Sequence, residues 1–247
     1  MSWIPVPPIL ALEKISKRFG AIVIADAIDL ALMPGEALGI IGPNGAGKTT
    51  LFGIMTGTIA PDAGRVFFDG ADITGASPPR RCRLGIARSF QIPQPFGDMT
   101  VFENLVVAAA FGAGRRERDA YGPCMDILEQ CGLAAAANRR AGSLTLLDRK
   151  RLELARALAT HPRVLLLDEV AGGLTEPECR ALVGHIKELR RGGLSIIWIE
   201  HVVHALLAAI DRLVVLHGGR LIAEGDPQTV IRSPQVADIY LGIAADA

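Results

Sequence analysis

The feature that most constrains the fold of this chain is a glycine-rich stretch in its first quarter, which reads Gly42-Pro43-Asn44-Gly45-Ala46-Gly47-Lys48-Thr49-Thr50. The stretch follows the pattern G-x-x-x-x-G-K-T of a phosphate-binding loop. The apolar run at residues 37–41 precedes it and predicts a buried strand, and residues 49–55 follow it and can open a helix. Because strand, loop and helix are the context that the motif requires, the stretch predicts an α/β fold with a phosphate site.

The residue types of this loop suit phosphate chemistry. Glycines let the backbone fold closely around a phosphate, so several N–H groups can point inward. The N-terminus of the following helix adds positive potential. Lys48 is expected to reach the β- and γ-phosphates of a nucleotide, and the Thr49 hydroxyl is expected to ligate Mg²⁺. A chance glycine-rich turn is the alternative, and the flanking strand and helix count against it.

Composition narrows the class of protein further. The 247 residues suffice for one large α/β domain, and the formal net charge of zero argues against a nucleic-acid-binding protein. The four cysteines form no C-x-x-C pair, which favours reduced thiols over a zinc site or a redox motif. Residues 1–8 lack a basic region and are broken by proline, so we expect no signal peptide. No apolar run approaches the roughly 20 residues of a membrane span, yet the mean hydropathy is +0.33, so we expect a partner to cover apolar surface.

Apolar periodicity and turn residues predict the other elements. We expect strands at residues 9–13, 22–25, 28–32, 65–70, 86–91, 164–169, 194–199, 212–216 and 220–223. We expect helices at residues 100–110, 121–131, 148–160, 177–191 and up to 209, a mobile loop at 112–118, and short helices in the tail at 227–242. The unbroken apolar runs that end at Asp168 and Ile199 favour a parallel sheet that is covered on both faces.

Polar side chains follow several of these strands, namely Lys48, Gln91, Asp168, Glu169 and His201. Ligands of open α/β sheets bind outside the carboxyl ends of the strands, so we expect these side chains to converge on the phosphates. Asp168 can hold Mg²⁺ through water, and Glu169 can act as general base on an attacking water. Gln91 can orient that water or touch the metal, and His201 can hydrogen-bond the γ-phosphate. Taken singly, the carboxylate pair could be a helix cap and the histidine a structural residue.

An aromatic side chain, Phe19, lies between the first two predicted strands. It can stack on a nucleotide base, because every base offers a π-face. Taken alone, Phe19 would more often be a core residue, and only the phosphate loop favours the stacking role.

These residues resemble the nucleotide-binding subunit of ATP-binding cassette (ABC) transporters over nearly the whole chain. Phe19 is similar to the adenine-stacking aromatic of that family, and residues 42–50 are similar to its Walker A motif. Gln91 is similar to the Q-loop glutamine, residues 164–169 to Walker B with Glu169 as the catalytic glutamate, and His201 to the switch histidine.

Within the family, four segments look like the branched-chain amino acid importer ATPases: residues 61–65, 84–91, 96–104 and 151–158. Relatives in that group also import urea, short amides and other small polar molecules. The resemblance therefore implies an ATPase that energises import of branched-chain amino acids or a related small polar solute.

The resemblance also implies an architecture, cofactors and partners. We expect a single ABC ATPase domain over residues 1–247: a P-loop NTPase core, an antiparallel β subdomain, an inserted α-helical subdomain at about 92–160 and a helical tail at 226–247. The implied cofactors are ATP and Mg²⁺, with Thr49, Gln91 and Asp168 as metal ligands. The implied partners are a second ABC ATPase subunit, identical or different, integral membrane permease subunits and, indirectly, a solute-binding protein. The chain would sit peripherally at the cytoplasmic face of the cell membrane.

The sequence departs from the family pattern at the signature motif. The usual L-S-G-G-Q or L-S-Y-G-Q is replaced here by Leu144-Thr145-Leu146-Leu147-Asp148. Thr145 keeps a hydroxyl and is expected to contact nucleotide, but Leu147 stands at the second glycine, where a Cβ opposes close approach to a γ-phosphate. In this family two subunits sandwich two ATP molecules and each signature completes the partner's site. The departure therefore concerns the site on the partner, whereas this chain's own Walker A loop is intact.

Two other functional classes stay open at this point. A non-transport ABC ATPase, such as an iron–sulfur assembly ATPase, would carry the same nucleotide motifs. A nucleotide-binding scaffold without turnover is the third reading, and the presence of Glu169 and His201 argues against it.

Overall fold

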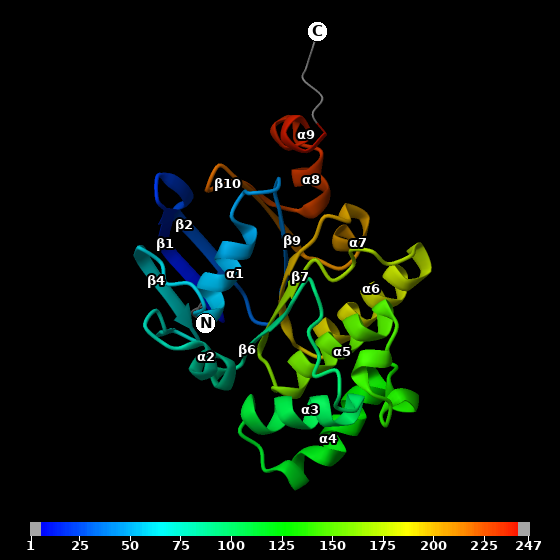
Figure 1. The fold of residues 1–247 in the computed structure, drawn as a ribbon. Coiled ribbons are helices and arrows are strands. Elements are labelled where there is room, and N and C mark those ends of the chain that lie inside the picture. Colours follow the sequence, from blue (N-terminus) through cyan, green and yellow to red (C-terminus); the bar gives the residue numbers. More distant parts are fainter. Residues whose placement is uncertain (1–5, 242–247) are drawn as a thin grey trace, which may run out of the picture.

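In the computed structural model, which describes residues 6–241, a six-stranded sheet forms the centre of the molecule (Figure 1). Its strands lie in the order β10-β9-β3-β8-β7-β6, with β10 antiparallel to β9 and the other neighbours parallel. Every residue of β3, β7 and β8 is buried, which is why these strands carry the unbroken apolar runs. The bounds of the strands are β3 (Ala37–Ile41), β6 (Ile86–Ser89), β7 (Val164–Asp168), β8 (Ser195–Ile199), β9 (Arg212–His217) and β10 (Arg220–Gly225).

A second, antiparallel sheet lies beyond helix α1 (Lys48–Thr56) on one face of the central sheet. Its strands have the order β2-β1-β4-β5. Phe52 of α1 shares one core cluster with Leu12 of β1 and Ile40 of β3, so the helix is packed between the two sheets. The bounds of these strands are β1 (Leu10–Phe19), β2 (Ile22–Leu32), β4 (Ala63–Phe68) and β5 (Ala71–Asp72).

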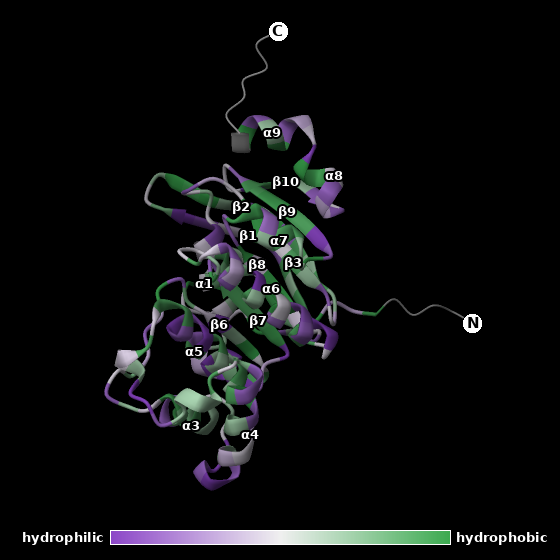
Figure 2. Cartoon of the chain, turned by 90° about the vertical axis from the view of Figure 1, so that its right-hand side faces the viewer, coloured by the Kyte–Doolittle hydropathy of each residue, from purple (hydrophilic) through white to green (hydrophobic). Residues whose placement is uncertain are grey.

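The other face of the central sheet is covered by helices α5 (Leu146–Ala159), α6 (Glu176–Arg191) and α7 (Val203–Leu207). The second core cluster joins Ile186 of α6 to Trp198 of β8. Figure 2 shows the strands β3, β7, β8 and β9 in the green of hydrophobic residues behind these helices. The prediction of a parallel sheet covered on both faces is confirmed.

A third core cluster belongs to the helices at the far end of the molecule, α3 (Val101–Phe111), α4 (Glu117–Gln130) and one face of α5. The 3₁₀ turns η1 (Ala134–Ala136) and η2 (Ala141–Ser143) connect α4 to α5. Parallel core, antiparallel sheet and inserted helices together confirm the expected fold class. The helices share a core of their own, but the division of the chain near residues 92–160 stays a prediction.

The described part of the chain ends with two short helices, α8 (Pro227–Ile231) and α9 (Pro234–Leu241), as the tail pattern indicated. Residues 242–247 of the predicted tail lie outside the described residues, as do residues 1–5, on which the signal-peptide expectation partly depends. Among residues 6–241, no helix combines the length and the apolar character that crossing a bilayer requires.

Several predicted strand boundaries were wrong, both in the antiparallel sheet and at β6 of the central sheet. Strand β1 continues to Phe19, so this aromatic belongs to the strand and not to a connection. One strand, β2, replaces the two that were predicted at 22–25 and 28–32, because Ala27 adopts a φ of 49° and lets the strand bend without ending. Strand β6 stops at Ser89, two residues before Gln91.

Two helices begin where proline or charge pointed to a loop. Helix α2 (Pro78–Leu84) was not predicted, since its prolines signal turns, but proline suits the first turn of a helix, where an N–H would be unpaired. Helix α4 begins at Glu117, inside the predicted loop at 112–118. Glu117 and Asp119 lie in its first turn, where negative charge is favourable.

Candidate nucleotide-binding site

The glycine-rich loop connects β3 to α1, and its last glycine caps the N-terminus of the helix. Gly47 is the N-cap residue, with a φ of 99° that side-chain-bearing residues rarely adopt. A Cβ built on Gly47 would lie 2.7 Å from the carbonyl oxygen of Ile24 in β2. The close approach of β2 and the left-handed backbone both require glycine here. This is the local reason for the final glycine of the motif.

The loop encloses a hollow of about 220 Å³. Its lining comprises Ile24, Asn44, Gly45, Ala46, Gly47, Lys48, Thr49, Thr50 and Glu169. A neighbouring hollow of about 170 Å³ is lined by Gly42, Pro43, Asn44, His201 and Ile239. The loop residues predicted to bind nucleotide therefore all face hollows, and Ile24 and Ile239 are lining residues that sequence reasoning missed.

Lys48 is buried and turned back onto the loop. Its Nζ donates to the carbonyl oxygens of Gly42 at 2.6 Å and Pro43 at 3.0 Å. Burial holds the pKa of Lys48 below its ordinary value, and the nearby carboxylates of Glu169 and Asp168 act in the opposite direction. A cation is thus held at the loop with two carboxylates close to it.

Two predicted side chains from other strand ends, Gln91 and His201, meet the predicted Glu169, the residue that follows β7. His201 Nε2 lies 2.9 Å from Glu169 Oε1, and Gln91 Nε2 donates to Glu169 Oε2. Glu169 has a φ of 48°, so the chain turns sharply there and aims the carboxylate toward the loop. The predicted convergence of these side chains is confirmed, and their catalytic roles stay predictions.

Asp168 occupies a different environment from its neighbour. It is buried at the end of β7, and its Oδ2 accepts a hydrogen bond of 2.5 Å from Arg88 Nη2. The Arg88 guanidinium lies 5.6 Å from the Phe52 ring centroid and 5.0 Å from that of Phe90. Sequence reasoning missed Arg88, although a charged residue within an otherwise buried strand was a usable signal.

Phe19 lies at the end of β1 with half of its surface exposed, at 51%. Lys17 Nζ is 5.3 Å from the centroid of its ring. The core alternative for Phe19 is therefore wrong, and an open ring face agrees with the stacking role, which stays a prediction.

The signature segment begins helix α5, where Thr145 is the N-cap residue. Its Oγ1 accepts a hydrogen bond of 3.2 Å from the backbone N–H of Asp148. Leu146 is exposed, and the Asp148 carboxylate lies 3.4 Å from Arg151 Nη1. Thr145 thus serves its own helix, and its contact with nucleotide stays a prediction.

Two buried charged residues support the loops around Glu169, and sequence reasoning gave neither a role. Glu200, at the end of β8, accepts hydrogen bonds from the backbone N–H groups of Ala171 at 2.9 Å and His201 at 3.0 Å. Lys150 of α5 donates to backbone carbonyls of the segment after β7. A charged residue at the end of an apolar strand signals such a role for Glu200, whereas nothing local signals it for Lys150.

The donor types near the loop fit a magnesium ion. Thr49, Gln91 and Asp168 offer hydroxyl, amide and carboxylate oxygens, the hard ligands that Mg²⁺ prefers. Within residues 6–241, no group of three or more His, Cys, Asp or Glu could hold a metal by itself. A set with one carboxylate suits an ion that takes its remaining ligands from water and phosphate.

The fold and the loop define a P-loop nucleotide-binding protein, and comparisons with known proteins narrow this class. Residues 25–172 match the family described as ABC transporter. The chain is 36% identical to the high-affinity branched-chain amino acid transport ATP-binding protein BraF of Pseudomonas aeruginosa, over 96% of this chain and 99% of that protein. It is 35% identical to the probable branched-chain amino acid transport ATP-binding protein LivG of Methanocaldococcus jannaschii, over 95% of this chain and 97% of that protein.

A solved structure agrees with these sequence matches. The ADP conformation of an ATP-binding cassette of an ABC transporter superposes with a TM-score of 0.88 at 34% identity, over 95% of this chain and 99% of that one. The chain belongs to the ABC transporter family. It is an ATP-binding cassette, an ATPase that hydrolyses ATP to energise transport.

Proposed function

We propose that this chain binds ATP with Mg²⁺ at its own phosphate loop and energises the import of branched-chain amino acids or a related small polar solute. Support for the solute class comes from full-length relatives at 35% and 36% identity, which are described as branched-chain amino acid transport ATP-binding proteins. The observation that carries the catalytic part is the contact of Gln91 and His201 with Glu169 beside the loop.

In this proposal the polar residues divide the tasks at the γ-phosphate among them. Lys48 exchanges its loop carbonyls for the β- and γ-phosphates. Glu169 accepts the proton of the attacking water, while Gln91 orients that water and His201 donates a hydrogen bond to the γ-phosphate. The loop backbone at residues 42–50 binds the phosphates, and Phe19 stacks on the adenine.

Thr49, Asp168 and Gln91 would hold Mg²⁺, which neutralises charge on the β- and γ-phosphates when bound. The pair of Arg88 with Asp168 already uses one carboxylate oxygen. The second oxygen of Asp168 is the one that would face a metal-bound water.

The partners follow from the same assignment. We propose that a second ABC ATPase subunit, identical or different, completes each ATP site with its signature segment, as Thr145 of this chain would do for the partner. The pair would sit peripherally on permease subunits at the cytoplasmic face of the membrane, and a solute-binding protein would act on the permease from the other side.

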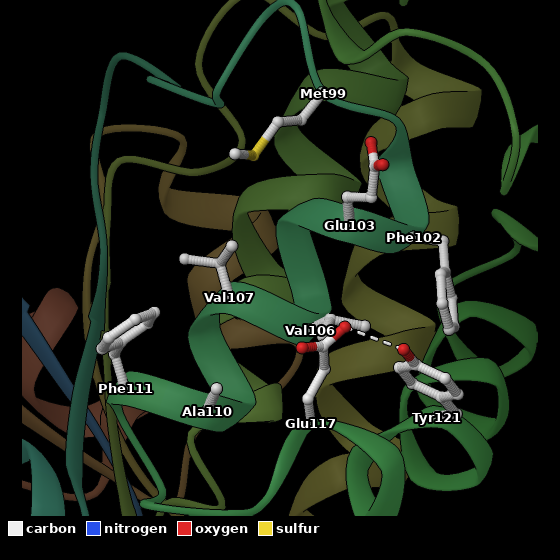
Figure 3. Close-up of a pocket in the computed structure, with 9 residues that line it drawn as sticks. All are labelled: Met99, Phe102, Glu103, Val106, Val107, Ala110, Phe111, Glu117 and Tyr121. Carbon is white, nitrogen blue, oxygen red and sulfur yellow. Dashed lines mark hydrogen bonds between the residues drawn. The ribbon is translucent and has the colours of Figure 1, made fainter.

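A groove on the helical part suits a segment of the permease (Figure 3). It measures about 490 Å³ and is lined by Met99, Phe102, Glu103, Val106, Val107, Ala110, Phe111, Glu117 and Tyr121. Phe111 is 81% exposed, which is unusual for an aromatic side chain unless something covers it. Glu103 and Glu117 add negative charge beside the apolar lining. We propose as occupant a short amphipathic helix of the permease with a basic residue at its rim.

The test is reconstitution of the chain with its partner ATPase and permease in proteoliposomes. Uptake of labelled leucine that depends on ATP, and that fails with Glu169→Gln, is the expected result. Uptake of another small polar solute in place of leucine would revise the solute class only.

The same preparation separates the proposal from a non-transport ABC ATPase. An importer ATPase should co-purify with permease subunits, and Phe111→Asp should weaken that association without changing ATP affinity. Full turnover and no association with any membrane subunit would contradict the importer assignment.

A further inference from the structure

Helix α5 carries three polar side chains that point into the protein at positions three residues apart, Lys150, Glu153 and Arg156. Lys150 and Glu153 are buried, and the Arg156 side chain is 22% exposed. Charged groups are buried only where partners satisfy them. The partners of these three lie on the two loops that carry Gln91 and Glu169.

Lys150 holds the segment that follows β7. Its Nζ donates to the carbonyl oxygen of Val170 at 2.9 Å and to that of Gly172 at 2.5 Å, and the carbonyl oxygen of Glu169 lies 3.4 Å away. An ammonium group has three donors, and three carbonyls of one turn surround it here. Burial lowers the pKa of Lys150, whereas the charges of Glu200 and Glu169 oppose that shift.

Glu153 and Arg156 hold the segment around Gln91. Arg156 Nη1 donates to the carbonyl oxygen of Gln94 at 2.9 Å and to Glu153 Oε2 at 3.1 Å. Burial raises the pKa of Glu153, and the Arg156 charge and the backbones of Gln94 and Phe90, on either side of Gln91, oppose that shift. The Arg156 guanidinium covers the ring of Phe96, 5.3 Å from its centroid.

We infer that Lys150, Glu153 and Arg156 are positioning residues that set Gln91 and Glu169 against each other for ATP hydrolysis. None of the three touches the reacting atoms, and each acts through backbone of a catalytic loop. The same helix begins at the signature residue Thr145, so a displacement of α5 by the partner's nucleotide would move both loops together. The inference rests on the proposed roles of Gln91 and Glu169.

The test uses the assembled transporter with Lys150→Met, Lys150→Arg and Glu153→Gln in this chain. Lys187→Met is the matched control, because Lys187 of α6 makes no hydrogen bond or ion pair among the described residues. Lys150→Met should lower kcat about 10–100-fold, since small misplacements of catalytic groups can cost up to about 100-fold. The ATP Kd should stay within about twofold, since the phosphate loop is untouched. Lys150→Arg should recover much of the loss, because a guanidinium can still donate to the carbonyls.

A double variant separates positioning from general destabilisation. Lys150→Met added to Glu169→Gln should cost little beyond Glu169→Gln alone, because the residue that Lys150 positions no longer acts as a base. A full additional 10–100-fold loss, or a parallel loss of ATP affinity and melting temperature, would show a merely structural role and overturn the inference. If Lys150→Met does not fold, the same measurements on Glu153→Gln test the inference. Normal turnover in Glu169→Gln overturns the proposed function, whereas a slow Glu169→Gln beside a normal Lys150→Met overturns this inference alone.

Discussion

Two helices of this molecule begin at motifs for which we propose a role at phosphate, and their N-termini are built differently. Helix α1 starts from Gly47, with no side-chain cap and no acidic residue in its first turn. Helix α5 starts from Thr145, whose hydroxyl accepts from the N–H of Asp148, and Asp148 adds a carboxylate to the first turn. The N–H groups of α1 are left for a ligand, while α5 satisfies one of its own and carries negative charge there.

The difference predicts that the two ATP sites are not equivalent in a sandwich of this chain with a different partner ATPase. The N-terminus of α1, at this chain's own phosphate loop, has the features that bind an anion. The end that would complete the partner's site has exposed Leu146, the branched side chain of Leu147 and an acid. We therefore expect hydrolysis to be faster at this chain's loop than at the loop its signature covers.

The largest effect is expected from Lys48→Ala, which removes the cation of the α1 site. Nucleotide binding or hydrolysis at this chain's loop should be abolished, because the phosphates lose their point charge. ATPase assays and nucleotide titration measure this, with Lys187→Ala as the control. Wild-type activity in Lys48→Ala would contradict the phosphate-loop assignment and, with it, the proposed difference between the N-termini of α1 and α5.

Glu169→Gln tests whether the site at this chain's own phosphate loop carries most of the ATP turnover. The substitution keeps shape and hydrogen bonding but cannot take a proton, and general-base catalysis is typically worth about 10²–10⁴-fold. ATP should still bind and close the sandwich. Steady-state ATPase of the transporter should fall further than it does for the same change in a different partner ATPase, and the exposed Glu129→Gln should change nothing. Equal losses would end the idea of unequal sites.

The subunit state offers a related test. Without ATP the purified chain should be largely monomeric and should hydrolyse ATP slowly, because another signature is needed at its loop. Sedimentation and ATPase assays on one sample measure both properties. Rapid turnover by a demonstrated monomer would be incompatible with sites shared between subunits.

Phe19→Ala probes the base end of the α1 site. ATP affinity should weaken by about 1–3 kcal/mol, the usual scale for stacking on a base. Phe67→Ala is the matched control, since Arg65 covers Phe67 in the same sheet much as Lys17 covers Phe19. An unchanged Kd for Phe19→Ala would leave the ring without a part in nucleotide binding.

The smallest effects are expected at the N-terminus of α5. Substitutions there that make the signature segment more like the phosphate loop at α1 test the difference between the two helix ends. Leu147→Gly removes the Cβ and should raise turnover a few-fold, even in a homodimer, where both sites carry Leu147. Asp148→Gln removes the acid and should tighten ATP-driven dimerisation by about 0.3–1 kcal/mol. Lower turnover in Leu147→Gly would count against the asymmetry.

Local sequence patterns were sufficient for the elements whose chemistry is contained in one stretch. The glycine spacing of residues 42–50 predicted the strand, loop and helix, and the helix predicted at residues 100–110 is present as α3, with a capping box formed by Thr100 and Glu103. The apolar runs of β7 and β8 predicted a parallel sheet, and its topology predicted that Gln91, Glu169 and His201 would meet.

Only the tertiary structure decided which distant groups pair within that frame. Arg88 and Asp168 are 80 residues apart in the sequence. They meet because β6 and β7 align Arg88 with Leu166, and Asp168, two residues further along β7, lies on the same face of the sheet as Leu166. Lys150 finds the carbonyls of the loop after β7 because α5 packs across that end of the sheet. Spacing along the chain determines which residues share a face of one element. The register of strands joined by long crossovers, and the seating of a helix on them, depend on the packing of the whole core.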